Sequence, residues 1–281
     1  MTETHGTRPR LLAQTGPAAS ARRIGGLVLR YWYVIRSSWP RMAELIYWPL
    51  LQMLMWGFLQ THLAKTTSFA ANAAGLFIGG VLLWDILVRS QLGFSVAFLE
   101  EYWSRNLGHL MMSPLRPFEL IAALMIVSLL KLSVAMVPVA FLAYVFFGFN
   151  VLSLGFAFAA FFANLILTSW TLGLISTGVV LRWGLGAESF SWLIVFVLLP
   201  VACVYYPLST LPGWLQPVAL ALPPTYVFEG LRALVTEGVF RGGDMAMALA
   251  LNLLYFCLGY AAFRWFLEEA RRSGSLVQMG E

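Results

Sequence analysis

The segment EEYWSRNLGHLMMSPLRPFELI, residues 100–121, is a charged and helix-patterned stretch between two of the most apolar runs in the chain. Its apolar residues recur at intervals of 4, 3, 1 and 3, as one face of a helix requires; they are Trp103, Leu107, Leu110, Met111 and Pro114. Glu100 and Glu101 precede this face, where the helix dipole favours negative charge, and SPLRP ends the helix. We therefore predict a short amphipathic helix over residues 100–113.

The composition around this segment is that of a membrane protein. Hydrophobic residues make up 60% of the 281-residue chain and charged residues only 11%, whereas about a quarter of the residues in a soluble domain are charged. Crossing the hydrocarbon core takes about 20 apolar residues in a helix. Six runs reach that length: 43–63, 75–99, 120–147, 154–181, 187–206 and 245–267. The sequence thus predicts an all-α membrane protein with six transmembrane helices, because long unbroken runs are not the alternating pattern of barrel strands.

The basic residues predict the orientation of these spans. Most of them fall on one side of the six spans: Arg8, Arg10, Arg22, Arg23, Arg30, Arg36, Arg41, Arg105, Arg116, Arg182, Arg271 and Arg272. Lys65, Arg232 and Arg241 fall on the other side. Positively charged loops stay in the cytoplasm, so both termini and residues 100–121 are expected there, in a bacterial inner membrane. We expect a polar tail over 1–23, a transmembrane domain over 24–268 and a cytoplasmic tail over 269–281, and no nucleic-acid partner, because the basic residues form no solvated face.

Two further segments are expected to lie at the membrane surfaces. IGGLVLRYWYVIRSSWPRM, residues 24–42, has apolar residues at helical spacing and arginines between them, which predicts an N-terminal amphipathic helix in the cytoplasmic interface. On the outer side, prolines interrupt the apolar residues 205–240; they are Pro207, Pro212, Pro217, Pro223 and Pro224. No straight helix tolerates that many interior prolines. We expect an outer re-entrant hairpin of two short helices, over 213–221 and 225–236.

Residues that carry catalysis are sparse. The three histidines, His5, His62 and His109, form no cluster for a metal or a nucleophile's base. Neither lysine, Lys65 nor Lys131, lies in a phosphate-binding GxxxxGK[ST] loop. Cys203 and Cys257 have no metal-ligand or disulfide spacing. We expect no catalytic residue, metal or cofactor in this chain.

Charged residues inside the predicted spans need a reason, because each costs roughly 2.5–3.5 kcal/mol at mid-bilayer on insertion scales. Asp85 and Arg89 are four residues apart on one helical face, where they can neutralise each other, whereas Lys131 has no local partner. These three form either a polar gate on a transport route or ion pairs that hold the bundle together. Glu229 and Arg232, three apart in the outer segment, are expected to pair as a structural cap.

Two stretches carry a family resemblance. The pattern EE-x5-LGHLMMSPLRPFE resembles the cytoplasmic motif of the type-2 ATP-binding-cassette (ABC) exporter permeases, and YYPLSTLPGWLQPVALALPPTYVFEGLRAL, residues 205–234, is similar to the same family's signature before its last span. The nearest resemblance is to permeases of the daunorubicin, nodulation-factor and polysaccharide exporter kind. Together with the six-span layout, it covers about residues 24–268.

The resemblance implies a permease that works as a homodimer or pseudo-dimer, in contact with membrane lipids. A separate nucleotide-binding ATPase subunit would bind the ATP and magnesium. The segment 100–113 would be the coupling helix, which contacts that ATPase through Glu100, Glu101, Trp103, Leu107, Gly108, Leu110, Met111 and Pro114. Spans one, two and five would line the route, and the outer hairpin, with Pro207, Pro212, Pro223, Glu229 and Arg232, would close it. The substrate would be amphipathic: a lipid-linked glycan, a polysaccharide or a hydrophobic drug.

Two other classes of function compete with this reading. An ion-coupled secondary carrier would use Asp85, Arg89 and Lys131 as a charge relay, although inverted repeats, usual in such carriers, are not evident. A membrane-embedded lipid-modifying enzyme would need acids, bases or metal ligands gathered at one membrane face, and the charges here are few and scattered.

Overall fold

The structure, a computed structural model, describes residues 16–66 and 76–272, without the side chains of Ala64, Thr66, Met111 and Leu152. Five of the described helices are long and apolar enough to cross a membrane: Trp39–Leu63, Leu76–Trp103, Pro117–Phe147, Gly155–Ala187 and Gly242–Arg272. They correspond to five of the six predicted spans and belong to α2 (Trp39–Thr66), α4 (Leu76–Trp103), α6 (Pro117–Phe147), α7 (Gly155–Trp183) and α11 (Gly242–Arg272). The predicted all-α membrane fold is confirmed.

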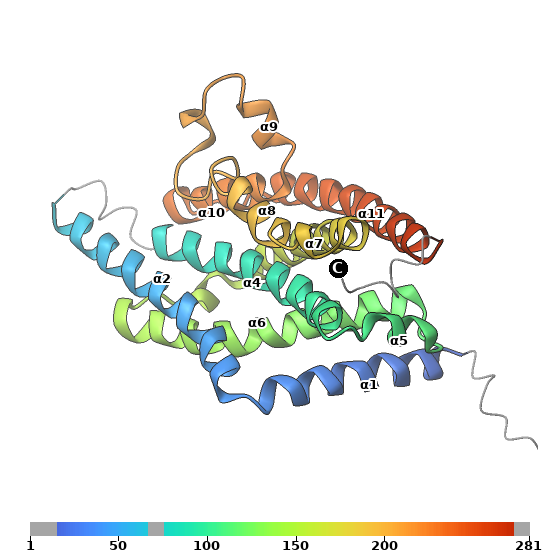
Figure 1. Ribbon diagram of the computed structural model, residues 1–281. Helices are drawn as coiled ribbons and strands as arrows, with labels where there is room; N and C mark the ends of the chain where they lie inside the picture. Colours follow the sequence, from blue (N-terminus) through green and yellow to red (C-terminus); the bar gives the residue numbers. More distant parts are fainter. Residues whose placement is uncertain (1–15, 67–75, 273–281) are drawn as a thin grey trace, which may run out of the picture.

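Helix α4 lies at the centre of this bundle (Figure 1). Its most apolar window is 78% buried, against 17% for α2 and 22% for α11. Small residues allow its close packing: a Cβ built on Gly93 would lie 3.2 Å from Cα of Ser128 on α6. On α7, a Cβ at Gly173 would meet the Phe94 ring at 2.7 Å. Helices in a membrane gain no hydrophobic driving force by leaving lipid, so they associate through close van der Waals packing, which small residues allow.

The ends of α6 are set by local chemistry. Pro117 occupies its first turn, where a missing N–H costs nothing. The Glu119 carboxylate accepts the backbone N–H of Arg116 at 2.9 Å, which closes a capping box. At the other end, Gly148 adopts a left-handed conformation with φ of 65°, the usual way for a helix to stop.

The fifth predicted span, 187–206, is not a continuous helix. A short 3-10 turn (Gly184–Ala187) leads into α8 (Phe190–Leu198), which has nine residues and is followed by turns. Pro200 explains the end of the helix, because it has no N–H to continue the helical ladder and restricts the residue before it. The prediction of one long helix here is therefore wrong.

The chain over 184–206 nevertheless runs along the whole length of α4. The Trp103 indole, at one end of α4, donates to the Glu188 carboxylate at 2.9 Å. Near the other end, a Cβ on Gly80 would lie 3.4 Å from the carbonyl oxygen of Val204. Helix α8 and the turns after it therefore cover the distance that a spanning helix covers elsewhere in the fold.

The outer segment contains two short helices, as the prolines predict. They are α9 (Gln216–Leu220) and α10 (Pro223–Glu237), with a 3-10 turn (Leu208–Thr210) before them. Pro223 and Pro224 occupy the first turn of α10, and Gly238, with φ of 69°, ends it. Figure 1 shows α9 standing clear of the long helices, joined to them through α10.

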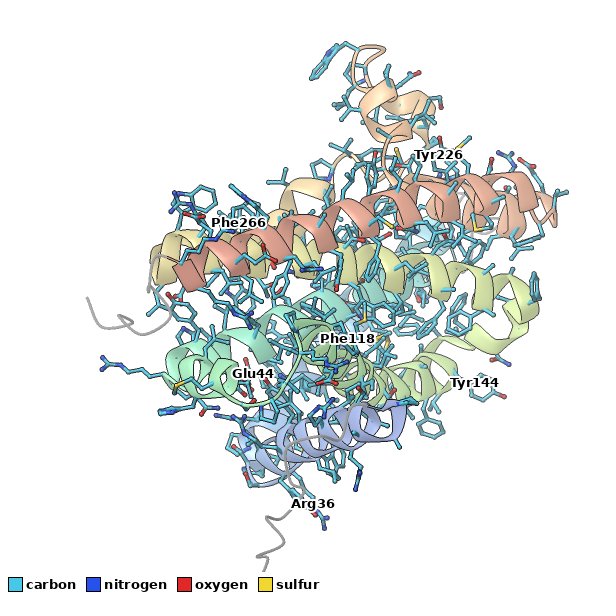
Figure 2. All side chains as sticks on the ribbon, turned by 90° about the vertical axis from the view of Figure 1, so that its right-hand side faces the viewer. Arg36, Glu44, Phe118, Tyr144, Tyr226 and Phe266 are labelled. Atoms are coloured by element: carbon cyan, nitrogen blue, oxygen red, sulfur yellow. The ribbon has the colours of Figure 1, made fainter. Side chains whose placement is uncertain are left out.

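The N-terminal helix α1 (Pro17–Arg36) begins earlier than predicted, so residues 17–23 are helical. Leu27, Tyr31 and Ile35 are buried on one face, which packs mainly against α6. Arg36 points away from the bundle (Figure 2). The predicted tails over 1–15 and 273–281 lie outside the described residues, while α11 continues through residues 269–272.

Candidate functional site

The predicted coupling segment is two helices rather than one. Helix α4 continues to Trp103, a turn follows, and α5 (Leu107–Met112) forms the second piece. Arg105 makes the turn with φ of 54°, a left-handed conformation that is uncommon outside glycine. Glu100, Glu101 and Trp103 therefore belong to the last turn of α4 and not to the first turn of the predicted helix 100–113, which corrects the prediction.

Glu101 is the centre of this junction. It is buried, and its carboxylate accepts a hydrogen bond from the Asn106 side chain at 2.6 Å. Arg30 of α1 reaches the same carboxylate, with Nη2 at 2.7 Å from Oε1 and 2.9 Å from Oε2. One acidic group thus connects α1, the end of α4 and the start of α5.

A phenol from α1 joins this junction. Tyr31 is buried, and its hydroxyl donates to the carbonyl of Ala97 on α4 at 3.2 Å. Burial, and then the charge of Glu101, raise the pKa of Tyr31 well above its ordinary value. Tyr31 therefore keeps its proton for this hydrogen bond at any physiological pH.

Glu119, at the start of α6, provides a second link to α1. Its buried carboxylate accepts two hydrogen bonds from Arg23, at 2.6 and 2.9 Å. Such bidentate pairs between arginine and a carboxylate are strong and geometrically specific. Both links hold α1 to the helices on either side of α5.

Lys131 has no partner among its sequence neighbours, as predicted, but it has one on another helix. Its Nζ lies 3.6 Å from the Glu100 carboxylate on α4. Lys131 is 7% exposed, so the pair lies between α4 and α6. The structure therefore turns both acidic residues of the predicted coupling motif toward the bundle.

The exposed surface of α5 differs from the predicted face. Leu107 is fully buried in the core cluster, Gly108 and Leu110 are half-buried, and the side chain of Met111 lies outside the described residues. Met112 is 76% exposed. His109 and Pro114 are also exposed. Among the described side chains on and beside α5, Met112, His109 and Pro114 are thus available to a partner, whereas Leu107 anchors α5.

Asp85 and Arg89 do not form the predicted ion pair in the described part of the chain. Asp85 is 1% exposed, and neither of its carboxylate oxygens has a hydrogen-bond partner among the described residues. The Nε of Arg89 is likewise buried without one. The Arg89 guanidinium is within electrostatic reach of Asp85 and of Glu44 on α2, so the two charges act on each other without touching.

An aromatic stack lies near this acid and was not predicted. The rings of Trp56, on α2, and Tyr205 are 4.6 Å apart and inclined by 17°. The ring of Phe77, on α4, stacks on the same Trp56 with a centroid distance of 6.5 Å. The Asp85 charge also acts on the Tyr205 hydroxyl. Elements α2, α4 and the turns after α8 thus meet around a buried acid and three stacked rings.

The outer pair Glu229–Arg232 is present, at 2.7 Å. Glu229 also accepts the backbone N–H of Leu208 at 2.7 Å, and Arg232 donates to the carbonyls of Cys203 and Tyr206 at 3.0 and 2.9 Å. The pair therefore satisfies the backbone of the turns that follow α8. Pro207 and Pro212 flank the 3-10 turn in this segment, and Pro223 starts α10.

The partners missed at the sequence level come from distant parts of the chain. Arg30 and Glu101 are 71 positions apart, and Arg23 and Glu119 are 96 apart. The signal available was Arg30 on the polar face of the predicted 24–42 helix and Arg23 directly before that helix. Its match with buried acids on α4 and α6 requires the tertiary fold.

Comparison with known proteins identifies the family. The family model for the ABC-2 type transporter matches residues 29–236, most of the chain. A comparison with curated proteins gives no match. Members of this family are multi-pass membrane components of transporters and work with a nucleotide-binding ATPase subunit. With five long apolar helices and a short helix between α4 and α6, the chain belongs to the ABC-2 type transporter family and is a permease subunit of an ABC transporter.

Proposed function

We propose that this chain is the permease of an exporter in a bacterial inner membrane, with α5 as the element that receives the conformational change of the ATPase. The substrate class is amphipathic: a lipid-linked glycan, a polysaccharide or a hydrophobic drug. A second identical copy completes the route, with both termini and α5 in the cytoplasm.

The observation that carries the proposal is the arrangement around Glu101. A force on α5 acts through Asn106 on the Glu101 carboxylate, and from there on Arg30 of α1 and on the end of α4. Because α4 is the most buried long helix, a displacement of its end is transmitted to the helices that pack on it. The exposed Met112 and His109 provide the contact surface for the ATPase.

The route is proposed to run beside the surface where α2, α4 and the turns after α8 meet. Trp56 and Tyr205 offer aromatic faces there, and Asp85 and Arg89 offer charge. Aromatic faces beside polar groups suit a substrate that has both apolar and polar parts.

The geometry disfavours a charge relay through Asp85, Arg89 and Lys131. Lys131 pairs with Glu100, which lies 15 residues beyond Asp85 on α4. That separation is about 22 Å along a helix, far beyond the reach of a hydrogen bond.

The test is a pull-down of the tagged permease with its ATPase in mild detergent, on Met112→Asp and Met112→Leu. Met112→Asp is expected to abolish copurification of the ATPase and the stimulated ATP hydrolysis, because a charge enters an apolar contact. Met112→Leu, which keeps an apolar side chain, is expected to retain both. Unchanged copurification with Met112→Asp would overturn the assignment of α5.

Leu107→Asp serves as the comparison variant, because it affects folding and not the contact with the ATPase. Because Leu107 is fully buried, Leu107→Asp is expected to reduce the yield of folded permease itself. Loss of the ATPase from a well-folded Met112→Asp permease then reports on the contact and not on folding.

A further inference from the structure

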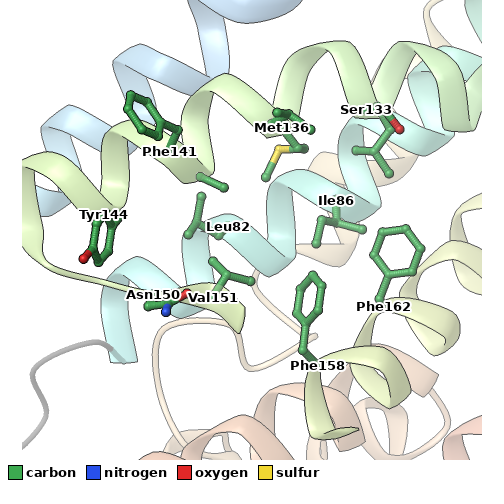
Figure 3. A pocket seen from close by; sticks show the side chains of 13 residues that line it. Leu82, Ile86, Ser133, Met136, Phe141, Tyr144, Asn150, Val151, Phe158 and Phe162 are labelled. Atoms are coloured by element: carbon green, nitrogen blue, oxygen red, sulfur yellow. The ribbon is translucent and has the colours of Figure 1, made fainter. Parts of the chain in front are cut away.

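An apolar cavity with no charged residue in its lining lies between the consecutive helices α6 and α7. It has a volume of about 500 Å³, in the range of ligand pockets. Helices α6 and α7 both pack on α4 but scarcely on each other. Leu82 and Ile86 of α4 (Figure 3) form the buried floor. Leu132 of α6, also buried, completes it.

The mouth of this cavity faces the surroundings of the bundle. Val137 and Phe141 of α6, at its rim, are 68% and 65% exposed. Phe158 and Phe162 of α7 line the opposite wall (Figure 3). These residues belong to helices that are long and apolar enough to span the membrane, so the mouth opens sideways into the region of lipid chains.

The lining has very few polar groups along the depth of the cavity. The hydroxyl of Ser133 donates to the carbonyl of Leu129 on its own helix at 2.9 Å. Water needs two to four polar partners, and a sugar or peptide would leave its polar groups unsatisfied. An empty cavity would forfeit the dispersion contacts of its lining. A hydrocarbon chain needs no hydrogen-bond partner and restores the dispersion contacts of the lining, so it suits this cavity.

Polar groups gather at one end only. Tyr144 and Asn150 line the cavity near the connection between α6 and α7, at the left of Figure 3 and far from Ser133. This connection lies at the end of α6 opposite to α5. The cavity is therefore apolar at its centre and polar toward one membrane surface, which is the polarity of a lipid.

We propose that this cavity is a binding site for one acyl chain of a bilayer phospholipid. The chain lies over Leu82, Ile86 and Leu132, and the headgroup is near Tyr144 and Asn150. The bound lipid fills the gap between α6 and α7 and acts as part of the packed bundle.

The experiment uses the full-length permease in vesicles of phosphatidylethanolamine and phosphatidylglycerol, with a fraction of the phosphatidylethanolamine carrying a photoactivatable diazirine in one acyl chain. After irradiation, the labelled positions are mapped by mass spectrometry. Labelling of Ile86 and Leu132 is expected, because only a chain inside the cavity reaches the floor. No transported substrate is present, so the label reports on a phospholipid.

Variants on α6 sharpen the result. Ala140→Trp, inside the cavity, is expected to abolish labelling of the floor, whereas Val145→Trp, on the exposed face of the same helix, is expected to leave it unchanged. If Ala140→Trp does not give a monodisperse protein, the exposed rim variant Val137→Trp takes its place, with the same expected loss.

Two outcomes would overturn the proposal. Labelling confined to exposed positions such as Val145 and Phe146 would mean that lipid only surrounds the protein. A wild-type protein with neither floor nor rim labelled would mean that another protein surface, such as a second copy, covers the mouth.

Discussion

Arg105 holds the break between α4 and α5 in a conformation that its side chain does not favour. Its φ of 54° lies in the left-handed region, where a Cβ crowds the following carbonyl at a cost of roughly 1–2 kcal/mol. The N–H of Asn106 bonds the carbonyl of Glu101 at 3.0 Å, which makes this turn a helix C-terminus of the kind that glycine usually occupies. An arginine at this position keeps a positive charge beside the surface proposed to meet the ATPase.

Two substitutions of Arg105 distinguish the effect of its backbone conformation from the effect of its charge. Arg105→Gly and Arg105→Ala both remove the charge, but only glycine relieves the conformation. We expect Arg105→Gly to be more stable than Arg105→Ala by about 1 kcal/mol. The midpoint of thermal unfolding in detergent measures the difference, and equal midpoints for the two variants would show that the turn is not strained.

Asp85 has a buried carboxylate that accepts no hydrogen bond from any residue that the structure describes. A buried charge without a partner in contact is destabilising. The local pattern predicted an ion pair with Arg89, and on that view Asp85→Asn would reduce the folded yield. Because no described residue hydrogen-bonds this carboxylate, the structure predicts the opposite effect of Asp85→Asn on stability.

We expect Asp85→Asn to stabilise the permease by on the order of 1 kcal/mol, because it removes the charge and keeps the shape. Asp85→Glu, which keeps the charge, is the matched control and should give no gain. The midpoints of thermal unfolding of the two purified variants, compared with the wild-type protein, show whether each change stabilises or destabilises the permease. Transport lost in a well-folded Asp85→Asn permease would mark Asp85 as part of the route.

At the scale of elements, α1 is bound to the bundle by charge as well as by its apolar face. Arg30 and Arg23 reach Glu101 and Glu119, the acids at the junctions of α5 with α4 and α6. A surface helix that lay only in the lipid interface would need no such partners. These contacts make α1 part of the junction around α5.

Removal of one partner tests that view. Arg30→Ala leaves Glu101 buried without its cation, which costs about 3–5 kcal/mol in a fully buried pair. Because the Arg30 side chain is 43% exposed, solvent screens the ion pair, and we expect the free energy of unfolding to fall by only about 1–3 kcal/mol. Arg36→Ala, at the exposed end of the same helix, is the control. ATPase stimulation is measured on the assembled complex for both variants. We expect Arg30→Ala to lose stimulation and Arg36→Ala to keep it, which would link α1 to coupling. Equal effects of the two variants would show that α1 takes no part in coupling.

The elements also show where sequence reasoning succeeds. Five spans followed from long uninterrupted apolar runs, and the pairing of Glu229 with Arg232 followed from a spacing of three on one helix. The break at Arg105 has no sequence signal, because a left-handed arginine looks like any other. Leu107 satisfied the amphipathic pattern yet faces the core, since periodicity shows that a face exists but not which way it points.

At the scale of the whole molecule, the path of residues 184–206 decides the topology. If this stretch crosses the membrane, α10 and the start of α11 lie on the side opposite to α5. If it does not cross, they lie on the same side. Its contacts with both ends of α4 favour a crossing, made of α8 and turns and stabilised by Arg232, which bonds two backbone carbonyls of those turns.

Cysteine labelling distinguishes the two topologies. In a background without Cys203 and Cys257, single cysteines replace the exposed His109 on α5 and the exposed Val239 between α10 and α11. A maleimide that cannot cross membranes is expected to label His109→Cys only in inside-out vesicles and Val239→Cys only in right-side-out vesicles. Labelling of both from the same side would mean that the broken segment turns back. It would then place the outer hairpin in the cytoplasm, where it could not close the outer end of a route.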